Sequence, residues 1–268
     1  MMSYRSVSQR FLGPDSDAVF HAIRVGIVGL SGGGSHVVQQ LAHLGVLHFT
    51  VADHDLIEEK NLNRLVGATA ADVAANMPKT SIAERVIKNV NPTAEVITCL
   101  CRWQQAVHHL RACDIVFGCV DSFKERSELE GFCRRFLMPY IDIGMDIHKS
   151  SQGFRMGGQV VLSSPGGPCL RCFGILSERR LAEEARQYGQ GGSAPQVVWP
   201  NGVLASIGVG LFVQLVTSWH DEPVATYCAE FDGNTHVVEA SRMAYASELR
   251  CQHFPGTEVG DPFFDRGG

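Results

Sequence analysis

A glycine-rich turn between a short apolar strand and the start of a helix is the feature that most constrains this chain. The stretch RVGIVGLSGGGS covers residues 24–35, and from the end of its strand onward the glycines fall at positions 29, 32, 33 and 34. Glycines let a backbone come close to a phosphate, and the free N–H groups at a helix N-terminus attract an anion. The G-x-G-x-x-G spacing of dinucleotide-binding turns is broken, because Ser31 occupies its third position. The turn therefore predicts an anion site in an α/β core, and a plain glycine turn is the alternative.

Strand-like and helix-like patterns alternate through the first 143 residues. When strands and helices alternate, each helix crosses over from one strand to a parallel neighbour; these crossovers are right-handed and give a mostly parallel sheet. We therefore expect an α/β fold with a Rossmann-like, mostly parallel sheet and helices on both faces. Strands are expected at residues 24–28, 49–52, 95–100, 115–120 and 139–143, and helices at 36–44, 78–90 and 122–136.

The second half of the chain predicts an antiparallel extension of this sheet. Strands are expected at residues 158–163, 225–232 and 236–239, with a helix over 203–217 and a loop over 189–200. We expect one domain over residues 1–268. Its nucleotide-binding half covers about 24–150, and its zinc-bearing, partner-binding half covers about 151–268.

Charge and composition exclude several classes of function. A net charge of −5 leaves no basic footprint for nucleic acid. No stretch of about 18 uninterrupted apolar residues predicts a membrane span, and the apolar segment from Leu204 to Val216 is interpreted as a buried helix. The nine cysteines have irregular spacing and no targeting signal precedes them, which indicates free thiols in the cytoplasm.

Polar residues gather after the predicted strands, where ligands of open parallel sheets bind. Asp53 follows the second strand about twenty residues after the turn, where a carboxylate accepts hydrogen bonds from a ribose. Arg64 and Lys79 suit phosphate oxygens, and Asp121 suits Mg²⁺. As alternatives, Arg64 and Lys79 are solvated surface charges, and Asp121 caps the helix that begins at Ser122. Together these groups favour a triphosphate over a nicotinamide cofactor.

Five motifs together resemble the ThiF/MoeB/HesA family, the bacterial relatives of ubiquitin-activating enzymes. They are GLSGGGS for the glycine turn, ADHDLIEEKNLNR for the acid-to-arginine stretch, PKT for the lysine, CVDS for the aspartate and GGPCLRC for a zinc pair. The similarity covers roughly residues 10 to 255. It implies that the protein uses MgATP to adenylate the C-terminal carboxylate of a ubiquitin-like protein or peptide, and that pyrophosphate is released.

The resemblance also implies a role for each matching residue. The ATP phosphates would be lined by Gly29, Gly32 and Gly34, and Asp53 would bind the ribose. The phosphates and their developing charge would be contacted by Asn61, Arg64 and Lys79. The Mg²⁺ ligand would be Asp121, with Asp55 as a second carboxylate nearby. The partner's own carboxylate attacks, so no side-chain nucleophile is needed and catalysis is positioning and electrostatics.

Three departures from the family pattern bear on this expectation. Ser31 replaces a glycine, and its hydroxyl either crowds the phosphate or donates a hydrogen bond to it. The family's N-terminal arginine, which reaches across a homodimer, has no clean counterpart, although Arg5 and Arg10 are available. No cysteine lies between Cys172 and Cys228, so the reaction is expected to stop at the acyl-adenylate unless another protein supplies a thiol.

The C-x-x-C formed by Cys169 and Cys172 predicts half of a structural zinc site. Zinc takes four tetrahedral ligands, and relatives supply a second C-x-x-C near the C-terminus. Here the segment ELRCQHF offers Cys251 and His253 instead, which gives a Cys3His set. A redox pair, or free thiols with a surface histidine, are the alternatives.

Two other functions compete with adenylation. An NAD(P)-dependent oxidoreductase would use the same fold, but the broken glycine pattern and the N-L-N-R stretch count against it. An inactive scaffold of the same fold is the third reading, and the presence of Arg64, Lys79 and Asp121 counts against that.

Overall fold

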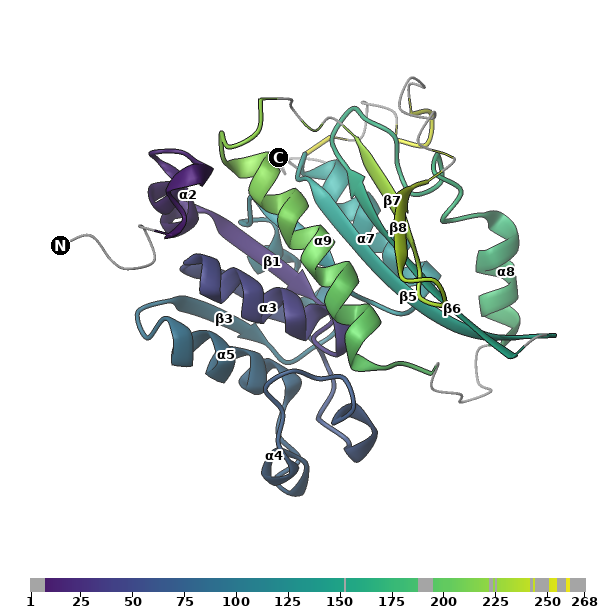
Figure 1. Ribbon diagram of the computed structural model, residues 1–268, viewed down its shortest axis with the longest axis horizontal. Helices are drawn as coiled ribbons and strands as arrows, with labels where there is room; N and C mark the ends of the chain where they lie inside the picture. The colour runs from purple at the N-terminus through teal and green to yellow at the C-terminus, as the bar shows by residue number, and fades with distance from the viewer. Residues whose placement is uncertain are drawn as a thin grey trace, which may run out of the picture.

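Eight strands form one mixed sheet in the order β3-β2-β1-β4-β5-β6-β7-β8 (Figure 1). The computed structural model describes residues 8–151, 153–187, 195–221, 224, 226–241, 243, 251–254 and 259–260. Strands β1 (Arg24–Val28), β2 (His48–Ala52), β3 (Glu95–Cys99) and β4 (Ile115–Gly118) are parallel, as the sequence predicts. The chain moves outward from β1 in both directions, so the strand order reverses between β1 and β4.

Strand β5 (Tyr140–Ser150) joins the parallel and antiparallel parts of the sheet. Its first residues pair in parallel with β4, and its whole length pairs antiparallel with β6 (Gly153–Ser163). The antiparallel part continues through β7 (Tyr227–Asp232) and β8 (Val237–Ala240). The expected antiparallel extension is therefore confirmed, but β5 runs seven residues beyond the predicted end at 143 and β6 begins five residues before 158.

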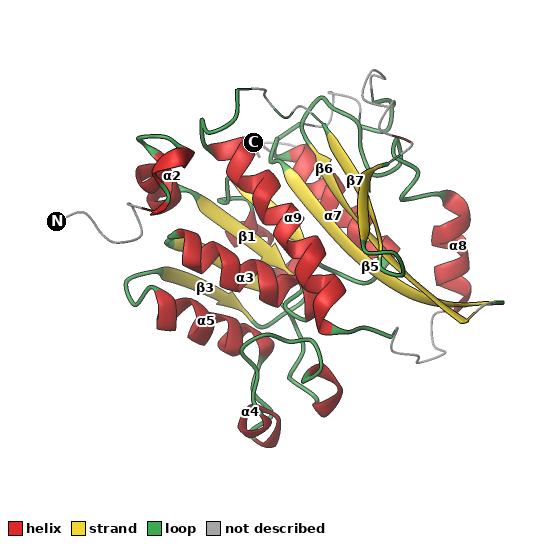
Figure 2. Cartoon of the chain, in the orientation of Figure 1, coloured by secondary structure: helices red, strands yellow, loops and turns green. Residues whose placement is uncertain are grey.

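Helices cover both faces of the sheet (Figures 1 and 2). Helices α3 (Gly32–Leu44), α5 (Lys79–Val90) and α9 (Val198–Val216) pack on one face over a core that includes Ile27 and Phe117. Helices α6 (Val107–Leu110) and α7 (Phe123–Arg135) pack on the other, over Val28 and Val116. Shorter elements connect these layers: η1 (Arg10–Leu12), α2 (Ser16–Ala22), η2 (Glu59–Asn61), α4 (Ala70–Ala74) and η3 (Trp103–Gln105).

Helices α3 and α9 begin several residues before their predicted starts, and one further helix was not predicted. Helix α3 begins at Gly32 rather than at 36, because the glycines themselves form its first turn. Helix α9 begins at Val198, so the last three residues of the predicted loop 189–200 are helical; residues 188–194 lie outside the described part of the chain. Helix α8 (Glu178–Gln187) was not predicted, although its ten residues are mostly strong helix formers.

Helix α9 is long and apolar enough to cross a membrane, with 19 residues and a mean hydropathy of 1.4. A core helix can have the same length and composition. Here half of its most apolar window is buried, and the helix packs against α3, β5 and β6. Leu204 and Phe212 are fully buried, which agrees with the predicted buried helix.

The glycine turn between β1 and α3 is packed too tightly for side chains. Gly29 has φ +85°, and a Cβ there would lie 2.5 Å from the carbonyl oxygen of Cys119. A Cβ on Gly34 would lie 1.8 Å from the carbonyl oxygen of Gly29. A Cβ on Gly32 would lie 2.5 Å from Nδ2 of Asn201 in α9. The turn therefore fixes how α3 leaves the sheet and how α9 lies against it.

We predict that Gly34→Ala lowers the free energy of unfolding by about 3 kcal/mol, because the new methyl group overlaps the Gly29 carbonyl. The matched control is Gly210→Ala in helix α9, where a Cβ meets nothing within 4 Å. This control should stabilise the protein by about 0.5–1 kcal/mol through helix propensity. Chemical denaturation measures both, and equal stability of the two variants would contradict the tight packing of the turn.

Candidate functional site

A cavity of about 570 Å³ lies beyond the carboxyl ends of the parallel strands, where the strand order reverses. Its wall comes from the segments that follow β1, β2, β3, β4 and from the middle of β5. The structure brings six of the predicted nucleotide-site residues to this wall: Gly29, Gly32, Asp53, Asp55, Lys79 and Asp121. Gly34, Asn61 and Arg64 are not part of the wall.

Asp53 holds the glycine turn against the end of β2. Its Oδ2 accepts a hydrogen bond from the N–H of Leu30 at 2.7 Å, and its Oδ1 accepts one from the N–H of Asp55 at 2.9 Å. Each carboxylate oxygen keeps a lone pair for a further donor. Asp53 therefore shapes the turn and also presents acceptor oxygens to the cavity.

Ser31 occupies the N-cap position of α3 without capping it. Its Oγ is buried and has no hydrogen-bond partner in the described part of the chain. The first N–H groups of a helix have no partner within the helix. Together with the positive end of the helix dipole, they make this part of the wall suited to an anion.

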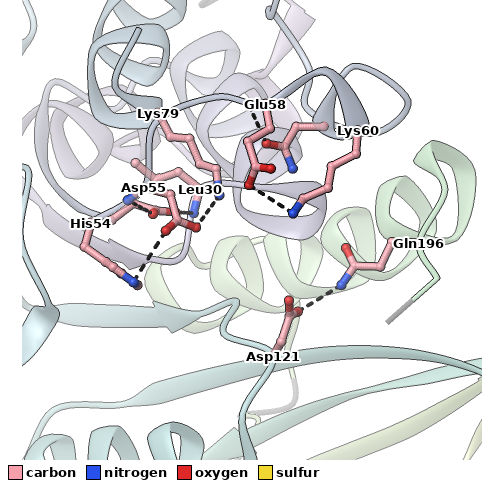
Figure 3. Close-up of polar contacts among 10 residues, drawn as sticks. Leu30, His54, Asp55, Glu58, Lys60, Lys79, Asp121 and Gln196 are labelled. Carbon is pink, nitrogen blue, oxygen red and sulfur yellow. Dashed lines mark hydrogen bonds and ion pairs between the residues drawn. The ribbon is translucent and has the colours of Figure 1, made fainter. Parts of the chain in front are cut away.

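Lys79 and Asp55 form a short ion pair at the edge of the cavity (Figure 3). Nζ of Lys79 lies 2.7 Å from Oδ2 of Asp55, and Lys79 is only 5% exposed. Burial opposes ionisation of Asp55, but the hydrogen bond and charge of Lys79 outweigh it and lower the pKa of that carboxyl. The backbone N–H of Lys79 also donates to the carbonyl of Asp55 at 3.1 Å. Lys79 is therefore a buried, positioned cation, and the alternative of a solvated surface charge is wrong.

Asn61 is the last residue of the short helix η2 and Arg64 follows this helix; neither residue lines the cavity. Oδ1 of Asn61 accepts from the N–H of Glu58 at 2.9 Å, which closes the helix start. Arg64 is 9% exposed, and its NH1 donates to the Lys60 carbonyl and to Oδ1 of Asn63. Its Nε has no partner among the described residues. Arg64 is thus a buried cation with unused donors, not a surface charge.

Asp121 follows β4 and faces the cavity with an exposed carboxylate. It does not cap helix α7: Ser122 is the N-cap and accepts from the N–H of Glu125 at 3.2 Å. Instead, Oδ1 of Asp121 accepts a hydrogen bond from Nε2 of Gln196 at 2.9 Å (Figure 3). The capping alternative is therefore wrong, and Asp121 is available to a ligand.

A buried polar network beside the cavity was missed in the sequence. Asp142 is fully buried in β5, its Oδ1 accepts from the hydroxyl of Tyr140 at 3.0 Å, and it lies 3.6 Å from Nε of Arg126. Burial raises the pKa of Asp142, and the charge of Arg126 partly offsets this effect. Arg126 itself lines the cavity. An aspartate inside an apolar strand is a signal for a buried paired charge, which would have found Asp142 but not its partner.

Asn201 is a second missed residue. It lies in the first turns of α9, is 4% exposed and lines the cavity beside Gly32. Its Nδ2 donates to the carbonyl of Val197 at 2.9 Å, which fixes the chain that enters α9. A polar residue within an otherwise apolar helical run was the available signal.

Cys169, Cys172, Cys251 and His253 come together away from the cavity, as predicted. Their four ligand atoms all lie within 4.8 Å of one another. Sγ of Cys169 lies 3.6 Å from Sγ of Cys172 and 3.4 Å from Nδ1 of His253. Neighbouring ligand atoms around a tetrahedral Zn²⁺ lie about 3.5–3.8 Å apart, given Zn–S of about 2.3 Å and Zn–N of about 2.0 Å. The cluster therefore has the donors and spacing of a tetrahedral metal site.

The ThiF family's sequence pattern matches residues 4–252. The chain belongs to the ThiF family. The resemblance that the motifs predict is therefore confirmed over nearly the whole chain, and so is the expected fold class.

Relatives of this ThiF-family protein include named activating enzymes. It is 31% identical to the SAMP-activating enzyme E1 of Haloferax volcanii over 164 residues, which is 60% of this chain and 57% of that one. It is 31% identical to the molybdopterin-synthase adenylyltransferase of Haemophilus influenzae over 62% of this chain and 66% of that one. These matches thus span less than two thirds of the relatives' own lengths. Among solved structures, E. coli MccB superposes with a TM-score of 0.73 at 20% identity, covering 90% of this chain and 72% of MccB.

An ion pair between Asp72 and Arg85 links helix α4 to helix α5, which begins at Lys79. Asp72 of α4 is 3% exposed and lies 2.6 Å from NH1 of Arg85 in α5, the helix that begins at Lys79. Hydrogen bonds from Arg85, and then from Thr69, lower the pKa of Asp72 far below its ordinary value despite burial. The pair therefore ties the connection between β2 and α5 to α5 itself.

We predict that Asp72→Asn lowers the free energy of unfolding by about 2 kcal/mol at neutral pH, because Arg85 loses its buried counter-charge. A carboxyl with a lowered pKa stabilises the folded state above its unfolded pKa, so the difference from wild type should shrink as the pH falls below 3.8. The control is Asp15→Asn, an exposed aspartate without a cap hydrogen bond. Denaturant unfolding from pH 7 to pH 3 measures both, and a constant difference across this range would contradict the ionic role of Asp72.

Proposed function

We propose that the protein is an ATP-dependent adenylyltransferase. It activates the C-terminal carboxylate of a small ubiquitin-like protein or a peptide as an acyl-adenylate and releases pyrophosphate. The observation that carries this proposal is that the glycine turn, buried Lys79 and the exposed carboxylate of Asp121 meet at one cavity at the switch point of the sheet. Membership of the ThiF family and relatives named as adenylyltransferases support it.

The proposed reaction is an in-line displacement at the α-phosphorus of ATP. An oxygen of the partner's carboxylate forms the new bond to phosphorus while the bond to the bridging oxygen breaks, and pyrophosphate leaves with the electron pair. The glycine turn and the N-terminus of α3 bind phosphate oxygens, and Asp53 accepts from the ribose. Lys79 and the unused donors of Arg64 stabilise the developing charge, and Lys79 does so in a buried place where its field is strong.

The two metal ions, Mg²⁺ and zinc, have different sites and different roles in this proposal. Mg²⁺ neutralises charge on the phosphates when bound, and it takes carboxylate ligands such as Asp121. Oδ2 of Asp121 accepts no hydrogen bond from any residue that the structure describes, so the ligand atom fits. Zinc at the cluster of Cys169, Cys172, Cys251 and His253 is structural, because the cluster is full with four protein ligands. It would tie residues 251–254 to the turn after β6.

The comparisons and the cysteines bear on two further questions: which protein donates the carboxylate, and whether the reaction stops at the acyl-adenylate. A relative from Gallus gallus is named ubiquitin-like modifier-activating enzyme 5, which supports a ubiquitin-like protein as the carboxyl donor, and the neighbour MccB was solved with MccA. The sequence has no cysteine between Cys172 and Cys228, and Cys228 is buried in β7. We therefore propose that this chain makes the adenylate without its own thioester. We also propose that it acts in the cytoplasm and as a homodimer. Two N-terminal arginines are available for a contact across a dimer, without a clean match to the family position: Arg5 lies outside the described residues, and Arg10 begins η1.

The direct test is ATP–pyrophosphate exchange with candidate carboxyl donors, such as small proteins that end in Gly-Gly and short peptides. We expect exchange to require both Mg²⁺ and a donor with a free C-terminal carboxylate, and amidation of that C-terminus should abolish it. Binding of NAD without binding of ATP would replace the proposal with an oxidoreductase. ATP binding without exchange for any donor would favour the inactive scaffold.

Asp121→Ala should reduce exchange at least about 100-fold, because the phosphates lose the carboxylate that holds their cation. Its melting temperature should stay at the wild-type value, since Asp121 is exposed and belongs to none of the hydrophobic clusters of the described residues. Asp221→Ala, at an exposed aspartate outside the cavity, is the matched control. Retained exchange in Asp121→Ala would remove Asp121 from the metal site.

Purified protein should contain about one zinc ion per chain, as measured by inductively coupled plasma mass spectrometry. Cys169→Ser should lose most of this zinc and lower the melting temperature, because the metal links two segments of the fold. Cys101→Ser is the control, since Cys101 lies outside the metal cluster. Full zinc content in Cys169→Ser, or none in the wild type, would contradict the assignment.

A further inference from the structure

We propose that Gln196 is a positioning residue that orients Asp121 for the divalent cation and links it to Arg64. This inference rests on the proposed function, because it concerns how the proposed cation and phosphate ligands are held. Gln196 lies two residues before α9, in the segment that enters this helix along the cavity.

A chain of hydrogen bonds runs across the site through Gln196. Its side-chain Nε2 donates to Oδ1 of Asp121 at 2.9 Å (Figure 3). Its backbone carbonyl accepts from Nδ2 of Asn63 at 2.9 Å. Oδ1 of Asn63 in turn accepts from NH1 of Arg64 at 3.0 Å. The carboxylate after β4 and the arginine after η2 are thereby connected through one residue of the α9 segment.

The middle of this series of hydrogen bonds, at Gln196, is anchored to the glycine turn through the next residue, Val197. Asn201 donates to the carbonyl of Val197, the residue next to Gln196, and Asn201 packs directly on Gly32. Gln196 therefore does not depend on its own burial to keep its place. It is held from both sides, by Asn201 through the backbone and by Asn63 at its carbonyl.

The geometry of the carboxylate explains what Gln196 does. Asp121 is exposed, and without a donor its side chain would exchange between rotamers. The N–H of Gln196 occupies one lone pair of Oδ1 and leaves Oδ2 free, so the carboxylate is turned without being blocked. Partners of this kind behind a metal ligand typically change metal affinity 10–100-fold. A neutral amide suits the position, because a second carboxylate here would repel Asp121.

Gln196 was not found from the sequence, since it lies in the segment that the sequence predicted as a loop, where no motif marks it. Its side chain and its backbone contact different residues, so a substitution can test the side-chain contact alone. The side chain reaches Asp121, whereas the bond to Asn63 uses the backbone carbonyl. A side-chain substitution at 196 should therefore act on the cation and leave the Asn63–Arg64 contact in place.

The test is calorimetric binding of ATP at a series of Mg²⁺ concentrations. For Gln196→Ala we expect a rise of about 10–100-fold in the Mg²⁺ concentration that gives half of the Mg²⁺-dependent change in ATP affinity. The affinity for ATP in excess EDTA should be unchanged. Gln196→Glu should show the same rise or a larger one at pH 8. Asn63→Ala should instead weaken ATP binding with and without Mg²⁺, because it releases Arg64. Gln105→Ala, at an exposed glutamine outside the cavity, is the control.

The outcomes separate this inference from the proposed function. Wild-type protein that binds no ATP, with or without Mg²⁺, would overturn both. Wild-type protein with Mg²⁺-dependent binding, together with an unchanged Mg²⁺ midpoint in Gln196→Ala, would overturn the role of Gln196 alone. An equal loss of ATP affinity in Mg²⁺ and in EDTA for Gln196→Ala would assign the residue a purely structural role and overturn the inference as well.

Discussion

The close packing of the turn between β1 and α3 is the constraint on which the rest of the structure depends. Three contacts meet there, each possible only without a Cβ: Gly29 on the carbonyl of Cys119, Gly34 on the carbonyl of Gly29, and Gly32 on Asn201. They bring the ends of β1 and β4 and the start of α9 to one point. Asp53 adds a hydrogen bond to Leu30 from the end of β2. The same packing that closes the core leaves the helix N-terminus facing the cavity.

Around this turn, two buried cations lie within a set of groups that a ligand can use. Lys79 is buried beside the exposed carboxylate of Asp55, whose pKa is lowered. Arg64 is buried against carbonyl and amide oxygens that do not neutralise it. Asp121 receives one hydrogen bond from a neutral amide. Burial of a cation without full compensation costs free energy, and a bound anion would offset that cost. The site therefore has the electrostatic character of a polyanion receptor with a separate place for a cation.

Local patterns were enough to predict the parallel half of the sheet, because its strands are short apolar runs with clear stops and its glycines and acids follow strand ends. The residues of the cavity wall on those ends, such as Asp53 and Asp121, were predicted for the same reason. Arg126 and Gln196 could not be predicted, since each reaches the cavity only through tertiary contacts between distant segments. Asn201 carried a signal as a polar residue in an apolar helical run, but its place beside Gly32 depends on tertiary packing. The ends of β5 and β6 were missed because an exposed hairpin lacks the alternation of a buried strand.

Strand β5 belongs to both kinds of sheet at once, and this has a consequence for any attempt to divide the protein. A fragment that stops near residue 150 would retain β5 but leave its whole β6-facing edge without backbone partners. Such an edge is a template for intermolecular strand pairing. The part of the chain up to β5, which holds the parallel strands, is therefore expected to self-associate as an isolated fragment. Engineered fusions or truncations should keep β5 and β6 together.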